Sequence, residues 1–374
     1  MIQNRVVVMA SPGFSKKTGY HMRVMRDVAL LSELHMDVRL VVLNGMFSYH
    51  ENGMKLSIVQ MARLWRSSSF IWCENIGSTF VARLLAIILG IKSKRLVLVM
   101  HGSLTELAHD KLGFMKYILY KGLLRHCFSN YHCVLCVSEY MKNSFTHEDP
   151  KSKLLFSPNL PSEEYIRHSN LAKSFSKNDL RKELKIETSK TIILYSGNTQ
   201  PWQKIDLLAD LMEVDAATEN RFHFVILTNE IIKFSQLLSS RSIAYDGFTL
   251  RSVGNLEVPR YLRASDFLYC LRDDNEINKF SCPTKAVEYL YSGSPMLVSA
   301  GLGDFADIVT ISKCGGVIDI EALETPRQIY DRVVNVIDNF SLTSNQQFSA
   351  YMEILLQGDY SREYAINVTK EALR

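Results

Sequence analysis

Short runs of β-branched and aromatic residues alternate with amphipathic helical patterns along most of the chain. A first series of predicted strands covers residues 6–11, 38–44, 69–74, 95–102, 133–139 and 153–159. A second series covers residues 191–198, 222–229, 248–255, 266–272, 295–300 and 315–320. Strands that alternate with helices form parallel βαβ units. The sequence therefore predicts an α/β fold with two Rossmann-like, doubly wound domains that face each other across a cleft.

A polar, highly charged stretch at residues 166–190 separates the two series. We interpret it as a connector with one short helix. The expected domains are an N-terminal Rossmann-like domain over 1–165 and a C-terminal one over 166–345. The remaining segment, 346–374, has a helical pattern without a following strand, and we expect it to pack back on the N-terminal domain. A chain of 374 residues is long enough for two domains with separate cores.

Charge and hydropathy limit the class of protein. A net charge of +4 suits an anionic partner such as a nucleotide or a membrane surface, and it is too small to indicate nucleic-acid binding. The first residues, MIQNRVVVMASPG, lack the long apolar core of a signal peptide. The most apolar window, residues 80–91, is too short to span a bilayer. We therefore expect a cytoplasmic protein that is soluble or peripherally bound to a membrane.

The cysteine pattern indicates a reducing compartment. Seven cysteines are an odd number, and they are scattered without the spacing of a disulfide framework. Cys133 and Cys136 form a C-x-x-C sequence inside a predicted buried strand, without a second pair, so we expect neither a metal site nor a redox site there. No other metal-ligand cluster and no D-x-D sequence stands out, and no metal or other cofactor is expected.

Two loops of the first series contain candidate site residues, because ligands of doubly wound sheets bind beyond the carboxyl ends of the strands. Gly19 precedes a helix and lets the backbone approach an anion, with Gly13 and Lys17 in the same loop. A flexible surface loop is the alternative. His101 ends a strand, where it could donate to a sugar hydroxyl, and Ser103 follows as a candidate helix cap. A lone histidine is more often structural.

The loop after the first strand of the second series, residues 197–204, contains the next candidates. Gly197 permits a tight turn, and Asn198 follows it. Lys204 stands near a predicted helix start, where the helix dipole disfavours a cation, so a nearby anion would explain it. A solvated lysine is the alternative.

The segment SCPTKAVEYLYSGSPMLVS, residues 281–299, reads as a helix from about 283 to 291 followed by a strand. Pro283 is expected at an early helical position, where its missing N–H costs nothing. Lys285 and Glu288 lie on one helix face, and an ion pair worth ~0.2–0.5 kcal/mol is the alternative to ligand binding. Backbone N–H groups suited to a diphosphate are expected from Ser281, Cys282 and Thr284.

In their order and spacing, these segments resemble the retaining GT-B-type glycosyltransferases, in particular the large nucleotide-sugar-dependent family that builds bacterial polysaccharides and glycolipids. The resemblance rests on PGFSKKTGYHMR, VMHGS, VLCVSEYMKNSF, FSPNLP, ILYSGNTQPWQKIDLL, VGNLEVPRYLRASDFLYC and SCPTKAVEYLYSGSPMLVS. The last segment is similar to a donor-site pattern of that family, P-x-K-x-x-E-Y-x-x-x-G-x-P.

The resemblance implies specific roles. Glu288 matches a glutamate that binds the donor ribose, Lys204 a basic residue on the diphosphate, and His101 a histidine near the transferred sugar. Gly19 matches a glycine near the diphosphate, and Val253 lies in the segment whose backbone reads the base. The predicted catalytic residues are His101, Lys204 and Lys285. The predicted donor-binding residues are Gly19, Gly197, Asn198, Val253, Ser281, Cys282, Pro283, Thr284 and Glu288, and the predicted acceptor-binding residues are Gly13, Lys17 and Ser103.

Two positions depart from the family pattern. Phe280 stands eight residues before Glu288, where the family often has the first glutamate of an E-x7-E motif, and Glu276 is out of register. Asn198 and Thr199 stand where an arginine commonly follows the glycine of this loop. The first departure concerns the contact with the donor sugar, and the second concerns the phosphate site.

The resemblance implies transfer of a sugar from a nucleotide diphosphate sugar to a hydroxyl of a saccharide or a lipid-linked saccharide, with retention. The helix expected at about 106–128 combines basic and apolar residues. It fits a peripheral contact with anionic lipid at the inner face of the cytoplasmic membrane, or an ordinary helix packed on its own sheet. Rival interpretations are a catalytically silent glycosyltransferase-like partner, a nucleotide-sugar binding protein, or an NDP-sugar epimerase of the same fold.

Overall fold

The computed structural model divides the chain into two compact units. The first comprises Met1–Leu160, Phe280–Cys282 and Gly358–Arg374, and the second comprises Pro161–Lys279 and Pro283–Gln357. The chain changes units close to the domain boundary expected at 165. The structure describes residues 4–11, 19–43, 48–88, 96–102, 115, 118, 121–122, 131–148, 153–186, 189–241, 243, 247–323, 325–340 and 351–374.

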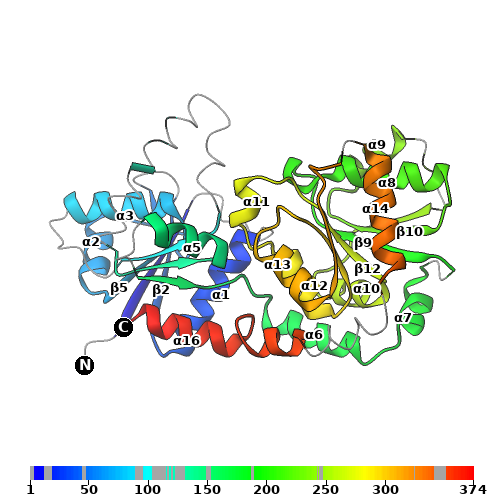
Figure 1. The fold of residues 1–374 in the computed structure, drawn as a ribbon. Helices are drawn as coiled ribbons and strands as arrows, with labels where there is room; N and C mark the ends of the chain where they lie inside the picture. Colours follow the sequence, from blue (N-terminus) through cyan, green and yellow to red (C-terminus); the bar gives the residue numbers. More distant parts are fainter. Residues whose placement is uncertain are drawn as a thin grey trace. The chain divides into compact units, whose positions relative to one another are not determined.

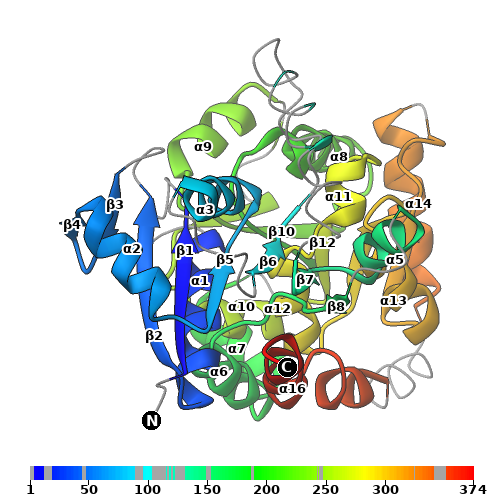
Figure 2. The same cartoon turned by 90° about the vertical axis from the view of Figure 1, so that its left-hand side faces the viewer.

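The first unit contains a sheet with the strand order β4-β3-β2-β1-β5-β6-β7-β8. Its parallel strands are β1 (Arg5–Ala10), β2 (Asp37–Leu43), β5 (Phe70–Cys73), β6 (Leu96–Met100), β7 (Cys133–Cys136) and β8 (Leu154–Phe156). These strands were predicted from their apolar runs, which are typical of strands buried on both faces. Figure 2 shows β1 between β2 and β5.

The sequence analysis missed a short antiparallel extension of this sheet. Strands β3 (Tyr49–Glu51) and β4 (Met54–Leu56) follow β2 with antiparallel pairing. Each has three residues, which is too short for an alternating pattern to be recognised. A helix that was also not predicted, α2 (Ile58–Arg66), follows them and begins with a capping box between Ser57 and Gln60.

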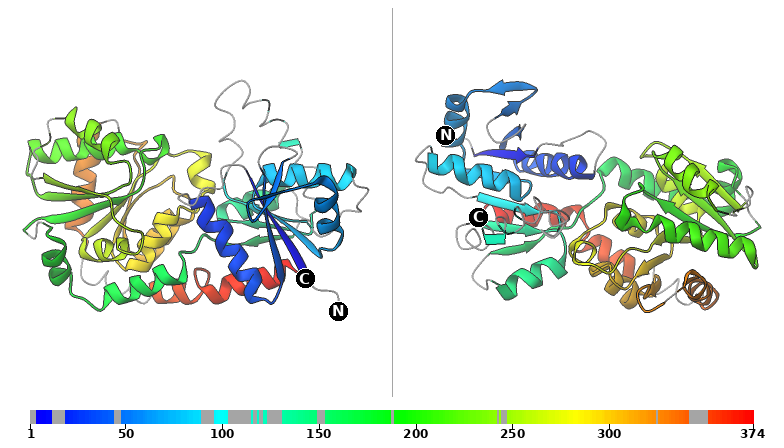
Figure 3. Two further views of the ribbon diagram at one scale, coloured as in Figure 1. Left: turned by 180° about the vertical axis from the view of Figure 1, so that it is seen from behind. Right: turned by 90° about the horizontal axis from the view of Figure 1, so that it is seen from above.

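The other helices described in the first unit are α1 (Gly19–Glu33), α3 (Ile76–Ile88), α5 (Glu139–Glu148) and α16 (Arg362–Ala372). Helix α16, at the end of the chain, packs against α1, β7 and β8. Figure 3 shows α16 beside α1. Val368 and Ala372 of α16 join the core formed by β1 and its neighbours, so the last helix is part of the first unit.

The second unit contains a sheet of parallel strands in the order β11-β10-β9-β12-β13-β14. The strands are β9 (Thr191–Ser196), β10 (Phe222–Leu227), β11 (Phe248–Arg251), β12 (Phe267–Cys270), β13 (Met296–Ser299) and β14 (Gly315–Ile318). All were predicted from the sequence. Figure 1 shows α8 (Ile205–Ala217) beside α14 (Pro326–Asp338), and these two helices pack on each other.

The interpretation of residues 166–190 as a connector with one short helix is wrong. Helices α6 (Glu163–Lys173) and α7 (Lys177–Leu184) belong to the second unit and pack against α10 (Val258–Ala264). Arg181 donates from Nε to the carbonyl oxygen of Ala264 at 2.8 Å and pairs with Asp266 at 2.6 Å. The segment looks polar because its buried side chains satisfy polar groups of the neighbouring helix and loop.

Each sheet has a point where the chain reverses the direction in which strands are added. In the second unit, β10 and β11 lie on one side of β9, and β12, β13 and β14 lie on the other. In the first unit, β2 and β5 lie on opposite sides of β1. Ligands of doubly wound sheets bind beyond the carboxyl ends of the strands at such switch points. The expected sites are therefore at β9 and β12, and at β1 and β5.

Candidate functional site

Helix α12 (Thr284–Ser292) begins at the carboxyl edge of the second sheet. Pro283 is its N-cap, with φ −63° and ψ 123°, one position before the early helical position that we expected. No side chain caps this end of the helix. The first turn of α12 therefore offers uncapped backbone donors next to Lys285.

Lys285 points its ammonium group at the end of β9. The Nζ atom lies 4.2 Å from the centroid of the Tyr195 ring, and the residue is only 8% exposed. The pKa of Lys285 is lowered to about 7, mainly by burial and with a smaller contribution from Arg272, whereas Glu288 acts in the opposite direction. Among the described residues Lys285 has no carboxylate partner, so the alternative of an ion pair with Glu288 is wrong.

Glu288 lies one turn further along α12 and is half-buried. Burial raises the pKa of Glu288 to about 8, although Lys285 acts against this shift. In the described part of the chain no side chain or backbone group donates a hydrogen bond to this carboxyl group. Its acceptor oxygens are thus available to a ligand.

The loop after β9 passes close to Lys285. A Cβ atom added at Gly197 would lie 2.8 Å from the Tyr195 hydroxyl oxygen and 3.4 Å from Lys285 Nζ. The Tyr195 hydroxyl donates to the carbonyl oxygen of Asn198 at 2.5 Å. Thr199 donates from its backbone N–H to Glu230 at 2.6 Å and from its hydroxyl at 2.9 Å. The loop is therefore held in a fixed shape, with no side chain at Gly197 to cover the ammonium group.

Lys204 does not need a ligand to balance its charge. It stands between the short helix η2 (Pro201–Gln203) and α8, and its Nζ atom lies 2.7 Å from Asp273 Oδ1. The hydrogen bond to Asp273 raises the pKa of Lys204. A carboxylate of the chain itself, rather than an external anion, explains a lysine at this helix start.

Arg272 is a residue of this edge that the sequence analysis did not select. It follows β12, is 6% exposed, and donates to Gln203 Oε1 at 3.2 Å and to Asn278 Oδ1 at 3.3 Å. Its position at the end of a predicted apolar strand is a signal that could have identified it. Val253 lies in the loop after β11 and is half-buried, at the same edge of the sheet.

Residues 280–282, between α11 (Glu276–Phe280) and α12, belong to the first unit. The Phe280 ring packs against Tyr140 and Phe145. Asn159 donates to the Cys282 carbonyl oxygen at 2.6 Å. Ser281 is half-buried. Phe280 therefore serves as an apolar anchor at the position where the resemblance leads one to expect an acid.

His101 lies after β6 in the first unit, as predicted. Its Nε2 atom lies 3.2 Å from Glu74 Oε2, and the Tyr20 ring packs against the imidazole edge-on. Burial lowers the pKa of His101 to about 3, with a smaller contribution from Arg23. Glu74 follows β5 and is fully buried, and its burial and the charge of Asp27 raise its pKa well above the usual value. His101 is therefore uncharged near neutral pH, and burial disfavours the ionised form of Glu74.

A hydrogen-bond network surrounds this pair at the switch point of the first sheet. The Tyr20 hydroxyl accepts from the Ser11 backbone N–H at 2.9 Å and from Asn75 at 3.2 Å. Burial disfavours the ionised form of Asp27, but the positive charges of Arg23 and Arg26 outweigh the effect of burial and lower the pKa of Asp27. Gly19 is the first residue of α1. The predicted acceptor-binding residues lie outside the described residues; these are Gly13, Lys17 and Ser103.

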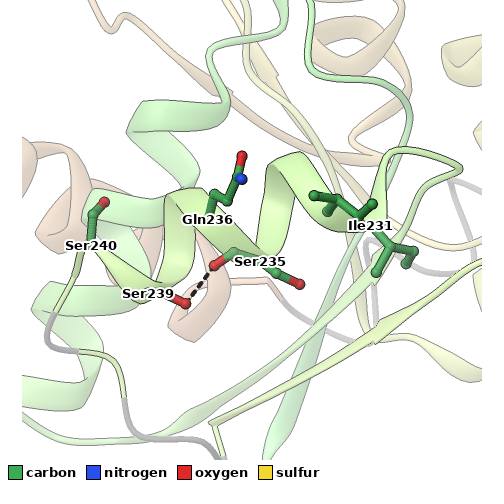
Figure 4. A pocket seen from close by; sticks show the side chains of 6 residues that line it. Ile231, Ser235, Gln236, Ser239 and Ser240 are labelled. Carbon is green, nitrogen blue, oxygen red and sulfur yellow. Dashed lines mark hydrogen bonds between the residues drawn. The ribbon is translucent and has the colours of Figure 1, made fainter.

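Other candidate features give no second site. Within the described ranges, no cluster of three or more potential metal ligands occurs. Cys133 and Cys136 are buried in β7, and burial raises the pKa of Cys133 to about 12, which makes a thiolate unfavourable. No described helix could cross a membrane. Figure 4 shows a shallow hollow along α9 (Ile231–Ser239), whose six lining residues are uncharged and cannot balance an anion.

No protein-family model matches the sequence, and no curated protein matches it either. Solved structures do match. Sucrose-phosphate synthase from Thermosynechococcus elongatus is 11% identical over 98% of both chains, with a TM-score of 0.72. HepE from Anabaena, in complex with UDP-glucose, is 11% identical over 98% of both chains, with a TM-score of 0.66. WaaG, a glycosyltransferase involved in lipopolysaccharide biosynthesis, is 11% identical over 99% of this chain and 98% of that chain, with a TM-score of 0.61.

These likenesses establish the fold. The chain is an α/β protein with two Rossmann-like units of the kind found in GT-B glycosyltransferases, as the sequence predicted. A fold of this kind hosts several activities, and the residues of the site decide which one a chain has.

Proposed function

We propose that the protein is a glycosyltransferase that transfers a sugar from a nucleotide diphosphate sugar to a hydroxyl group of a saccharide. The observation that carries this proposal is the position of Lys285: a buried ammonium group without a carboxylate partner among the described residues, in the first turn of α12 and at the end of β9. An uncapped helix N-terminus beside a buried cation suits a diphosphate. The solved structure of HepE with UDP-glucose supports the same class of donor.

The second unit is proposed to bind the donor. Negative charge develops on the departing diphosphate, and the α12 backbone donors and Lys285 would stabilise it as it forms. Glu288 would accept hydrogen bonds from the two ribose hydroxyls. The Gly197–Asn198 turn would lie against the phosphates, and the segment around Val253 would contact the base. Because protein cations can offset the diphosphate charge, we propose that the reaction requires no metal ion.

The first unit is proposed to contact the sugars being joined. His101 stays neutral, so it can donate one hydrogen bond to a sugar hydroxyl without adding charge, while Glu74 fixes its ring. We propose retention of anomeric configuration, with the diphosphate oxygen taking the proton of the acceptor hydroxyl. For an acceptor in surface polysaccharide or glycolipid synthesis, WaaG is the supporting neighbour.

We also propose a cytoplasmic location with a peripheral contact to anionic membrane. Met115 is 69% exposed and Ile118 is 55% exposed, and Lys121 near them is exposed as well. Exposed apolar and basic side chains on one segment suit binding to an anionic lipid surface. Cosedimentation with vesicles that contain anionic lipid tests this point, and equal binding to neutral vesicles would contradict it.

The proposed function is tested by binding and turnover. Thermal unfolding is measured with UDP, GDP, dTDP and CMP sugars, because a ligand that binds only the folded state raises its melting temperature. The sugar that stabilises the protein is then incubated with candidate acceptors, with and without EDTA, and release of the nucleoside diphosphate is measured. Stabilisation without turnover on any acceptor would favour a binding protein or a silent partner. No stabilisation by any of the sugars would contradict the proposal.

A further inference from the structure

Arg272 stands out among the buried arginines of the chain. Three arginines in the described part are more than nine-tenths buried: Arg23, Arg181 and Arg272. Arg23 pairs with Asp27 at 3.5 Å and Arg181 pairs with Asp266 at 2.6 Å. Arg272 pairs with no described carboxylate. A buried charge without an opposite charge is unfavourable, so this position calls for an explanation.

The hydrogen bonds of Arg272 leave the charge of its guanidinium group unbalanced. Its Nη atoms donate to the neutral amide oxygens of Gln203 at 3.2 Å and Asn278 at 3.3 Å. Its Nε–H is buried and has no partner. Neutral amides orient the guanidinium group but cannot neutralise its charge. The group is therefore held in place and keeps hydrogen-bonding capacity toward an anion.

A second buried cation is close enough to interact with the first. Arg272 follows β12 and Lys285 lies at the end of β9, and these are the neighbouring strands that define the switch point of the second sheet. Their mutual repulsion contributes to the lowered pKa of Lys285. Two buried like charges at the place where doubly wound sheets bind phosphate are best explained by a ligand with more than one negative charge.

We infer that Arg272 binds the diphosphate of the ligand together with Lys285, whereas Lys204 has its charge balanced by Asp273. This inference rests on the proposed function, because the diphosphate is that of the sugar donor. The guanidinium fork would donate to oxygens of one phosphate group, and the ammonium group would contact the other.

The test compares two buried arginines of the same unit. Arg272→Met should lose at least tenfold in affinity for UDP, GDP or dTDP, whichever binds the parent, and for inorganic pyrophosphate, measured by isothermal titration calorimetry. Without ligand, its melting temperature should equal or exceed that of the parent, because an unbalanced buried charge is removed. Arg181→Met is the matched control: it should lower the melting temperature by breaking the pair with Asp266 and leave both affinities unchanged.

Several outcomes would overturn the inference. It is wrong if Arg272→Met binds the nucleotide and pyrophosphate within twofold of the parent. Should this variant fail to fold, Arg272→Lys decides: it keeps the charge but loses the fork, and an affinity equal to that of the parent overturns the inference.

The proposed function can fail separately. A parent protein that binds pyrophosphate through Arg272 but none of the nucleotides would keep the diphosphate site and contradict the glycosyltransferase proposal. A parent that binds neither pyrophosphate nor any nucleotide would overturn both.

Discussion

Lys285 places its ammonium nitrogen 4.2 Å from the centroid of the Tyr195 ring, at the end of the first strand of the second unit. The ring face attracts the cation but does not neutralise it. The Tyr195 ring thus holds Lys285 in place, while the ammonium charge remains available to an anionic ligand. This arrangement explains why the same helix face can hold Glu288 without an ion pair between the two side chains.

Replacing Glu288 by glutamine tests the assignment of the ribose site. Hydrogen bonds from the ribose favour the ionised carboxylate in the complex, so loss of this acceptor should weaken binding of the nucleotide sugar by about 1.5–3 kcal/mol, which is roughly 10- to 100-fold. Calorimetric titration measures the affinity. Glu183→Gln is the control, because Glu183 of α7 forms an exposed ion pair with Arg260 of α10, and the change should not affect binding. Equal affinities of Glu288→Gln and the parent would show that the ribose binds elsewhere.

The raised pKa of Glu288 also predicts a pH dependence of stability. The unfolded chain ionises this carboxyl near its ordinary value, whereas the folded protein keeps it protonated up to about pH 8. The contribution of the protonated carboxyl to stability is therefore lost progressively as the pH rises from 4.5 toward 8. Relative to the parent, Glu288→Gln should gain stability between pH 6 and 9. Urea denaturation across this range measures the difference in the free energy of unfolding between the two proteins. If that difference does not change with pH, the raised pKa of Glu288 is disproved.

Lys285 should make donor binding depend on pH as well. A bound diphosphate favours the ammonium form, so affinity should be constant below about pH 7 and decrease above it, where the empty site loses the proton. A nucleotide sugar is a suitable probe because its diphosphate does not titrate near neutrality. The measurement is made in the Glu288→Gln background, which removes the titration of the neighbouring carboxyl. Lys285→Met in that background should bind the nucleotide sugar weakly at every pH. If its affinity still decreases above pH 7, the pH dependence belongs to a group other than Lys285.

Gly197→Ala should destabilise the second unit for a steric reason. The new methyl group would meet the Tyr195 hydroxyl oxygen at 2.8 Å, and this hydroxyl is held by Asn198. Overpacking of this kind costs about 1–3 kcal/mol. In the background of Tyr195→Phe the same change should cost less, since the obstructing oxygen is absent. Denaturant unfolding of the four proteins in this double-mutant cycle gives the coupling, and a cost independent of Tyr195 would rule out the steric explanation.

His101 should remain uncharged across the physiological range. With its pKa lowered to about 3 by burial, its ring signals in an NMR titration should not shift between pH 5 and 8. The exposed His147 provides signals for comparison. The unfolded chain does protonate His101 below about pH 6.5, so its contribution to stability decreases as the pH falls from 6.5 toward 3. A ring titration with a midpoint near 6.5 would contradict a neutral His101.

Much of the fold could be predicted because its strands are buried on both faces. Runs such as Thr191–Ser196 and Phe267–Cys270 are apolar throughout, and they alternate with helical patterns, which is enough to predict parallel units. The antiparallel strands Tyr49–Glu51 and Met54–Leu56 were missed because they are short and partly exposed. In residues 163–184 one short helix was expected, and the packing of two helices was missed because their polar side chains resemble those of a solvated connector.

The candidate site was predicted only in part. The glycine at 197, the lysine at 285 and the glutamate at 288 were identified from local patterns of helix start and turn. Arg272 was missed because its place at the end of a predicted strand does not show whether a buried arginine pairs with a carboxylate. Lys204 was selected for its place near a helix start, yet Asp273, which lies in the loop after β12, balances its charge.

The sequence by itself determined the order of strands and helices, the division into two series, and the residues at the carboxyl ends of the strands. These properties depend on periodicity and local turn chemistry, which are encoded over short stretches of chain. Only the tertiary structure decided which charges are balanced. Whether Arg272, Lys204 and Lys285 have carboxylate partners depends on contacts between residues far apart in the sequence, and burial then decides how strongly an unbalanced charge favours an anion.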